Sequence, residues 1–152
     1  MEFGKFFGVL FMFFCQLYVL LAAEKVKKYT DWNGSHWSSA WHLNRYDGEI
    51  SMNVEEAWKM GYTGKNVVVA VVDDGIEYDH PDLARNYDPK ASTDLVDGDS
   101  DPYPRIYKDE QGRVLNSHGT KCAGIIAAEA GNGICGVGVA HDVKLGGRFY
   151  IA

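Results

Sequence analysis

The sequence contains no serine and no threonine between Lys121 and Ala152. This stretch therefore supplies no serine or threonine hydroxyl as a nucleophile for covalent catalysis. Positive charge is also in the minority, because 15 Lys and Arg residues stand against 21 Asp and Glu residues, for a net charge of −6. Such a balance argues against nucleic acid as the main partner.

Acidic residues are concentrated in one part of the sequence. Ten Asp and Glu residues lie between Asp73 and Asp101, against two basic residues, Arg85 and Lys90. This concentration favours bound cations or a basic ligand, and the alternative is a solvated acidic loop. The length and the 46% hydrophobic content are those of one globular domain with its own core.

The N-terminus has the pattern of a secretory signal peptide over residues 1–23. Lys5 precedes an apolar stretch from Phe6 to Leu21, which is followed by Ala22-Ala23-Glu24. Gln16 interrupts the stretch, so we expect no stable membrane span after cleavage; an uncleaved anchor is the alternative. The signal predicts the secretory pathway, in the Golgi or outside the cell.

Two further features fit a secreted protein. Asn33-Gly34-Ser35 is an acceptor for N-glycosylation, although a plain Asn-Gly turn would have the same sequence. Of the cysteines after the signal, Cys122 lies in the first turn of a predicted helix and Cys135 beyond its end, about 18 Å away. They are too far apart to pair. Cys135 is then half of a disulfide whose partner is absent, or a buried thiol.

Hydrophobic patterning predicts an α/β layered fold. Residues 52–60 form an amphipathic pattern with Asn53 as the expected N-cap. The continuous apolar run 67–72 predicts a strand that is buried on both faces, as in a parallel sheet. Residues 119–130 predict a helix so poor in bulky side chains that we expect close neighbours on several sides. A second strand is expected near 142–145.

Asp73 and His118 stand at the ends of these elements. Asp73 follows the predicted strand, where parallel sheets form their sites, and Gly75 permits a sharp turn directly after it. His118 opens the predicted helix, forty-five positions later. An Asp that orients a His is the arrangement of serine hydrolases. Taken singly, a turn-capping Asp and a helix-capping or core His are the simpler interpretations.

The sequence around these two residues resembles the subtilisin-like proteases, and among them the kexin/furin-type proprotein convertases. The resemblance runs from about Asp31 to Gly147. Its motifs are Asp73-Asp74-Gly75-Ile76-Glu77, His80-Pro81-Asp82-Leu83, His118-Gly119-Thr120-Lys121-Cys122-Ala123-Gly124 and Cys135-Gly136-Val137-Gly138-Val139-Ala140. It implies a subtilisin-like three-layer fold with a mostly parallel sheet, present only in part, with residues 51–147 as the N-terminal part of the peptidase domain.

The resemblance also implies an activity, that of a calcium-dependent serine endopeptidase that cuts secretory precursors after paired basic residues. Asp73 matches the catalytic aspartate and His118 the catalytic histidine. Asp74 matches a carboxylate in the pocket for a basic substrate residue. A carboxylate there would pair with Lys or Arg.

Two calcium sites are implied in part by the same resemblance. Calcium prefers several carboxylate and carbonyl oxygens on a flexible loop. One site would use the side chains of Asp94, Asp99 and Asp101. The other would use Asp82, Asn132 and Asp31, together with the carbonyl groups of Glu129, Ile134 and Gly136.

The sequence departs from the family in several places. Residues 24–50 form an N-terminal arm in which Lys25-Val26-Lys27-Lys28 resembles only a remnant of a propeptide cleavage site, and the propeptide itself is missing. Whether Lys28 is a processing site stays open. Leu115 and Ile125 replace acidic residues that are usual in the family, and residues 148–152 form a divergent tail.

The most serious departure is the missing nucleophile. An Asp–His pair without a serine forms no acyl-enzyme, so we expect this chain alone to be inactive. Cys122 and Cys135 each have a structural place and are not expected to replace the serine. Two alternatives to an incomplete protease are a non-catalytic secreted fragment that binds calcium or basic peptides, and a gene model that lacks an exon.

Overall fold

The computed structural model describes residues 40–43, 49–105, 107–113, 115–134 and 136–150. Contacts divide the chain into two units, Met1–Asp31 and Trp32–Ala152, and the described residues all belong to the second. The expected signal peptide (1–23), Asp31, Asn33 and Cys135 lie outside the described residues. No helix within the described residues is both long and apolar enough to span a bilayer.

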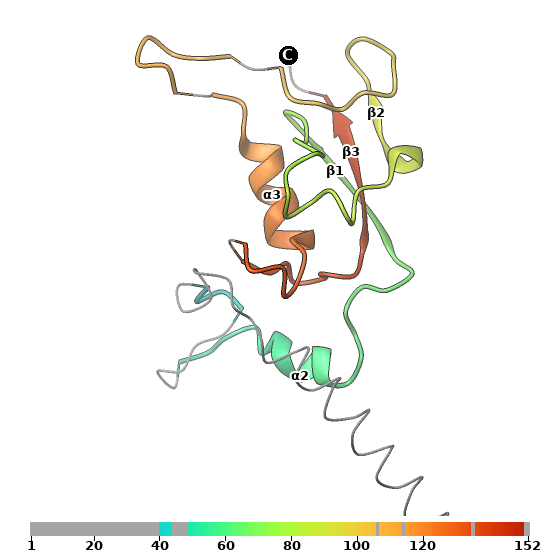
Figure 1. The fold of residues 1–152 in the computed structure, drawn as a ribbon, viewed down its shortest axis with the longest axis vertical. Helices are drawn as coiled ribbons and strands as arrows, with labels where there is room; N and C mark the ends of the chain where they lie inside the picture. Colours follow the sequence, from blue (N-terminus) through green and yellow to red (C-terminus); the bar gives the residue numbers. More distant parts are fainter. Residues whose placement is uncertain (1–39, 44–48, 106, 114, 135, 151–152) are drawn as a thin grey trace, which may run out of the picture. The chain divides into compact units, whose positions relative to one another are not determined.

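Three parallel strands form the sheet, in the order β1-β3-β2 (Figure 1). In chain order the elements are α2 (Val54–Lys59), β1 (Val68–Asp73), the 3₁₀ helix η2 (Pro89–Ala91), β2 (Thr93–Asp94), α3 (His118–Ala127) and β3 (Lys144–Phe149). The predicted α/β class with a parallel sheet is therefore confirmed.

β3 is the central strand of this sheet. It pairs with β1 from Val68↔Lys144 to Asp73↔Phe149, and with β2 at Thr93↔Arg148 and Asp94↔Phe149. Gly146 and Gly147 let other segments approach β3, since a Cβ at Gly146 would collide with the Ala91 carbonyl. The strand expected near 142–145 thus begins at Lys144 and continues through Arg148 and Phe149.

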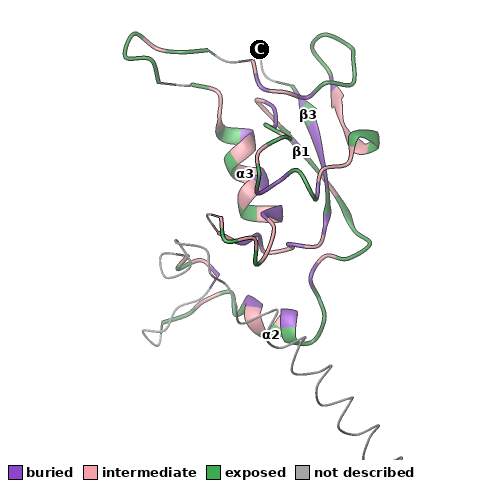
Figure 2. Cartoon of the chain, viewed as in Figure 1, coloured by how far each residue is buried: buried purple, intermediate pink, exposed green. Residues whose placement is uncertain are grey.

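β1 is less buried than the sequence predicts. Val68, Ala70 and Val72 are exposed, while Val71 is buried on the opposite face (Figure 2). The expectation of burial on both faces is wrong for the described residues. β1 is an edge strand of the described sheet. Because its residues are apolar on both faces, the sequence does not indicate which face is covered by another layer.

α3 packs against β1 and β3 through one face. Its buried residues are Gly119, Ala123 and Ala127, which recur every four positions and therefore align along one side of a helix. A Cβ at Gly124 would meet nothing within 4 Å, and Ile125 is exposed. The expected close neighbours on several sides are thus absent among the described residues. The core comprises Val71, Ile76, Leu83, Ala123, Ala127, Val143 and Leu145.

α2 is anchored through Trp58. The indole Nε1 of Trp58 donates a hydrogen bond of 2.8 Å to the Val139 carbonyl, and the ring packs edge-on against His141. Asn53 occupies the N-cap position but in a left-handed conformation, with φ of 50° and no capping bond from its side chain. The prediction that Asn53 caps the helix is therefore wrong as to the hydrogen bond.

Asn86 ties three segments together. Its buried side-chain amide donates to the carbonyls of Ala127 (2.8 Å) and His141 (2.7 Å). The main-chain carbonyl of Asn86 accepts a hydrogen bond from the N–H of Leu145 in β3. One residue thus joins the end of α3, the loop before β3 and the central strand.

We predict that Asn86→Ala lowers the free energy of unfolding by about 2–4 kcal/mol, because two buried carbonyls lose their donors. Urea denaturation measures the difference. Gln111→Ala, on an exposed loop, is the control and should stay within about 0.5 kcal/mol of the parent protein. Equal stability of Asn86→Ala and the parent would show that these bonds contribute nothing.

Candidate active site

Asp73 is the last residue of β1, as the sequence predicts for a site at the carboxyl end of a parallel strand. The N–H of Asp74 donates 2.8 Å to Asp73 Oδ1, which fixes the carboxylate. Gly75 has a φ of 107°, and a Cβ there would lie 2.7 Å from Pro104 Cα. Only glycine fits this turn without strain, which confirms the expected sharp change of direction.

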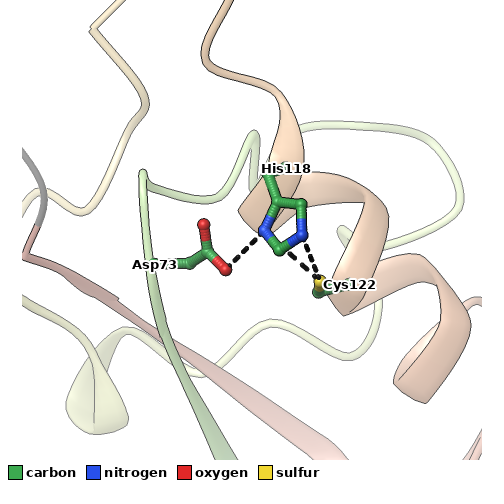
Figure 3. Close-up of side chains that lie close together, drawn as sticks. All are labelled: Asp73, His118 and Cys122. Atoms are coloured by element: carbon green, nitrogen blue, oxygen red, sulfur yellow. Dashed lines mark hydrogen bonds and ion pairs between the residues drawn. The ribbon is translucent and has the colours of Figure 1, made fainter.

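His118 is the first residue of α3, and its ring faces Asp73 (Figure 3). The distance from Nδ1 of His118 to Oδ2 of Asp73 is 2.7 Å. The Asp73 side chain is 16% exposed, whereas that of His118 is 72% exposed. The carboxylate is thus partly covered, whereas the imidazole reaches solvent. The structure brings the two predicted catalytic residues into direct contact.

Asp74 connects the same two elements through the backbone. Its Oδ2 accepts from the N–H of His118 (3.0 Å) and its Oδ1 from the N–H of Gly119 (2.7 Å). A carboxylate at a helix N-terminus satisfies free N–H groups and complements the helix dipole. Gly119 permits the approach, because any Cβ there would collide with the Gly75 carbonyl. Asp74 therefore acts in this structure as the N-terminal anchor of α3.

The charge of Asp73 is favoured by its hydrogen bonds. Burial alone would raise the pKa of Asp73, but the hydrogen bonds from the Asp74 N–H and from His118 outweigh it and lower the pKa. Asp73 is therefore ionised near neutral pH. An ionised carboxylate on Nδ1 orients the imidazole and leaves Nε2 for proton transfer.

Cys122 lies beside the same imidazole. Its Sγ is 3.7 Å from Nδ1 and 3.8 Å from Nε2 of His118. Burial, followed by the charges of Asp73 and Asp74, raises the pKa of this free thiol. The catalytic pair expected from the sequence does not include Cys122. The sequence feature that indicates its place is the spacing of four residues between His118 and Cys122, which puts the two side chains on one face of a helix.

The residues of the first expected calcium site lie at the end of β2 and on the segment that follows it. Asp94 Oδ1 accepts from the N–H groups of Val96 and Asp97, while its Oδ2 lies 3.6 Å from Nη2 of Arg105. Asp99 and Asp101 accept from backbone N–H groups two residues further along. The oxygen donors suit calcium in kind. Arg105, which also pairs with Asp97, competes for Asp94.

The residues of the second expected calcium site come together from distant parts of the chain. The buried Asp82 accepts 2.6 Å from the side-chain amide of Asn132, and its carbonyl accepts from the N–H of Glu129. Asn132 Oδ1 in turn accepts from Ile134 N–H. Asp82 and Asn132, with the main-chain carbonyls expected from the sequence, offer an oxygen-rich set of the kind that calcium prefers. Gly136 lies on the same loop, next to Cys135.

Comparison with known proteins assigns the chain to a family. A sequence model of the subtilase family of peptidases (Peptidase S8) matches residues 64–149, more than half of the chain. Bovine furin is 52% identical over 107 residues, which cover 70% of this chain and 13% of furin. Furin-1 of Xenopus laevis is 49% identical over 131 residues, which cover 82% of this chain and 16% of that protein.

Structural comparison agrees. A crystal structure of the serine protease of Aeromonas sobria, in complex with its chaperone, superimposes with a TM-score of 0.64 at 34% identity. The match covers 77% of this chain and 20% of that one. The predicted subtilisin-like fold is therefore confirmed for the part that is present.

The share of the relatives that the chain covers is small. Human proprotein convertase subtilisin/kexin type 6 is 50% identical over 119 residues, which cover 12% of that protein. The chain thus spans about a tenth to a sixth of the length of these curated relatives. It belongs to the subtilase family of subtilisin-like serine proteases, and within that family it is similar to furin and the proprotein convertases.

Proposed function

We propose that this chain carries the Asp–His half of the active site of a proprotein-convertase-type serine endopeptidase. The observation that supports the proposal most is the 2.7 Å contact between Asp73 Oδ2 and His118 Nδ1 at the end of a parallel strand. In the proposed reaction, the solvent-facing Nε2 of His118 takes the proton of a serine hydroxyl and later gives it to the leaving amine. Asp73 stabilises the imidazolium that forms.

The proposed substrates are secretory precursors with paired basic residues. Asp74 is the proposed contact for the basic residue next to the cleaved bond, and its carboxylate lies beside the catalytic histidine. The signal pattern at residues 1–23 supports an encounter in the secretory pathway. Leu115, which replaces an acidic residue of the family, is expected to weaken one contact with basic substrate.

The nucleophile of the proposed mechanism is not found beside His118 among the residues that the structure describes. Among the described residues, the His118 ring contacts Asp73 and Cys122, and no serine or threonine follows Thr120. The chain tested by itself is therefore proposed to be inactive. The second candidate function, a secreted binding fragment, rests on the same observation together with the oxygen-rich set around Asp82.

Calcium is the proposed cofactor. Asp82, Asn132 and the carbonyls of Glu129, Ile134 and Gly136 would hold one ion, with Asp31 as a further ligand. Asp94, Asp99 and Asp101 would hold another once Arg105 leaves Asp94. Bound calcium would stabilise the loops that flank α3 and take no part in proton transfer.

A chimera tests the proposed catalytic role. Residues 51–149 are joined to the remaining part of the catalytic domain of bovine furin, which supplies a serine. We expect the chimera to cleave a fluorogenic Arg-X-Lys-Arg substrate, and Asp73→Asn to lower kcat by about 10⁴-fold because the imidazole loses its orienting partner. Asp79→Asn, an exposed control, should leave kcat unchanged. The proposal fails if Asp73→Asn matches the parent chimera, or if the 152-residue chain alone shows turnover that His118→Ala abolishes.

The role of Asp74 in specificity is separable from its role as a helix anchor. In the same chimera, Asp74→Asn removes the charge and keeps only one carbonyl oxygen for the α3 N–H groups. We expect kcat/KM to fall about 10- to 100-fold more for a Lys-Arg substrate than for an Ala-Arg substrate, the loss of a hydrogen bond to a charged group. An equal fall for both substrates would assign Asp74 to positioning alone.

Calcium binding is tested on the 152-residue chain by thermal unfolding and calorimetric titration. At a free calcium concentration of 100 times Kd, stability should rise by about 2.7 kcal/mol. Asp82→Asn should lose the share of this response that comes from its own site, and calorimetry should count one ion fewer, even if its baseline stability also falls, whereas the exposed Glu110→Gln should keep the full response. An unchanged calcium response in Asp82→Asn would remove this residue from the site.

A further inference from the structure

The guanidinium of Arg105 lies between the acidic segment after β2 and the end of β3. Its Nη2 contacts Oδ2 of Asp97 and lies 3.6 Å from Oδ2 of Asp94. The guanidinium carbon lies 4.8 Å from the centre of the Phe149 ring, within the range of a cation–π contact. Two carboxylates and one aromatic face therefore hold this cation in place.

Asp94 is buried, and its two carboxylate oxygens have different partners. Oδ1 accepts hydrogen bonds from the N–H groups of Val96 (2.6 Å) and Asp97 (3.0 Å), whereas Oδ2 faces Arg105. A buried carboxylate without a cation is unfavourable, because burial removes the water that stabilises its charge. Arg105 thus supplies the positive charge that Asp94 needs in this structure.

The sheet fixes the main chain at Asp94. Asp94 in β2 pairs with Phe149 in β3 (Figure 1), and the N–H of Leu95 donates 2.9 Å to the Phe149 carbonyl. Asp94 therefore stays beside Arg105 as long as these strands are paired. Because main-chain N–H groups hold Oδ1, Oδ2 is the oxygen that Asp94 can offer to another cation.

We propose that Arg105 and calcium are alternative partners of Asp94 Oδ2, so that Arg105 sets the affinity of the first calcium site. This inference rests on the proposed calcium cofactor. The place of the guanidinium supports it, since these carboxylates already hold a cation and oxygen atoms are the ligands that calcium prefers. When calcium binds, Arg105 releases Asp94 and keeps Asp97 as its partner.

The competition distinguishes the two expected calcium sites. An internal competitor weakens the apparent affinity in proportion to the fraction of molecules whose site is free. If Arg105 holds Oδ2 in about nine of ten molecules, calcium binds about 10-fold more weakly than it would without the guanidinium. In the second site, Asp82 bonds to the neutral side-chain amide of Asn132, so this effect belongs to the first site.

Calorimetric titration of the 152-residue chain with calcium tests the inference without peptidase activity. In Arg105→Gln we expect the Kd of one site to fall about 10-fold or more, while the other site keeps its affinity. Adding Asp101→Asn to Arg105→Gln should remove this increase in affinity, which assigns it to the first site. Arg105→Lys keeps the positive charge and should stay within about 3-fold of the parent chain.

Arg113→Gln is the matched control, because it removes the same charge from a residue that pairs with Asp109 instead. It should leave the affinity of both calcium sites unchanged. Equal or weaker calcium binding at the first site in Arg105→Gln would overturn the inference, and calcium bound at the second site would then still support the proposed cofactor. Failure of every chain to bind calcium would overturn both.

Urea unfolding of the same variants gives a second readout. Without calcium, Arg105→Gln should be less stable than the parent chain, because Asp94 loses its cationic partner. At saturating calcium the difference should narrow, since the ion then replaces that partner. A difference of equal size with and without calcium would show that Arg105 and calcium do not compete for Asp94.

Discussion

The carboxylate of Asp74 is the link on which the site depends, because it holds the first turn of α3 against the end of β1. The strand fixes Asp73, the helix fixes His118, and Asp74 sets the separation of the two. The contact is close only because Gly119 has no side chain and Gly75 turns in a conformation that glycine favours. Two glycines and one carboxylate thus define the geometry in which an imidazole meets its orienting partner.

The parts of the fold that were predictable depend on local pattern. The run 67–72 and the small residues after His118 indicated a strand and a helix, and the strand end and helix start placed Asp73 and His118 where they meet. The contribution of Cys122 also lay within reach, since a spacing of four residues is local information.

Other features depend on contacts that no local pattern carries. The outward face of β1 looks like its inward face in sequence, so Val68 and Val71 could not be told apart. The left-handed Asn53 and the bonds of Asn86 to Ala127 and His141 depend on the packing of distant segments. The pairing of Arg105 with Asp94 likewise brings a cation from beyond the acidic cluster into it.

The register of β1 with β3 carries a consequence for the order of events in folding. Val68 pairs with Lys144, half the chain away, and both strand pairings in the described sheet are parallel, so neither can form first as a hairpin. A large loop must therefore close before any strand–strand bond compensates the lost entropy, which makes formation of such a sheet slow. Until it closes, the apolar outer face and free edge of β1 are available to other chains. The fraction of the chain that reaches the state in which Asp73 contacts His118 therefore depends on the concentration of the chain while the sheet forms.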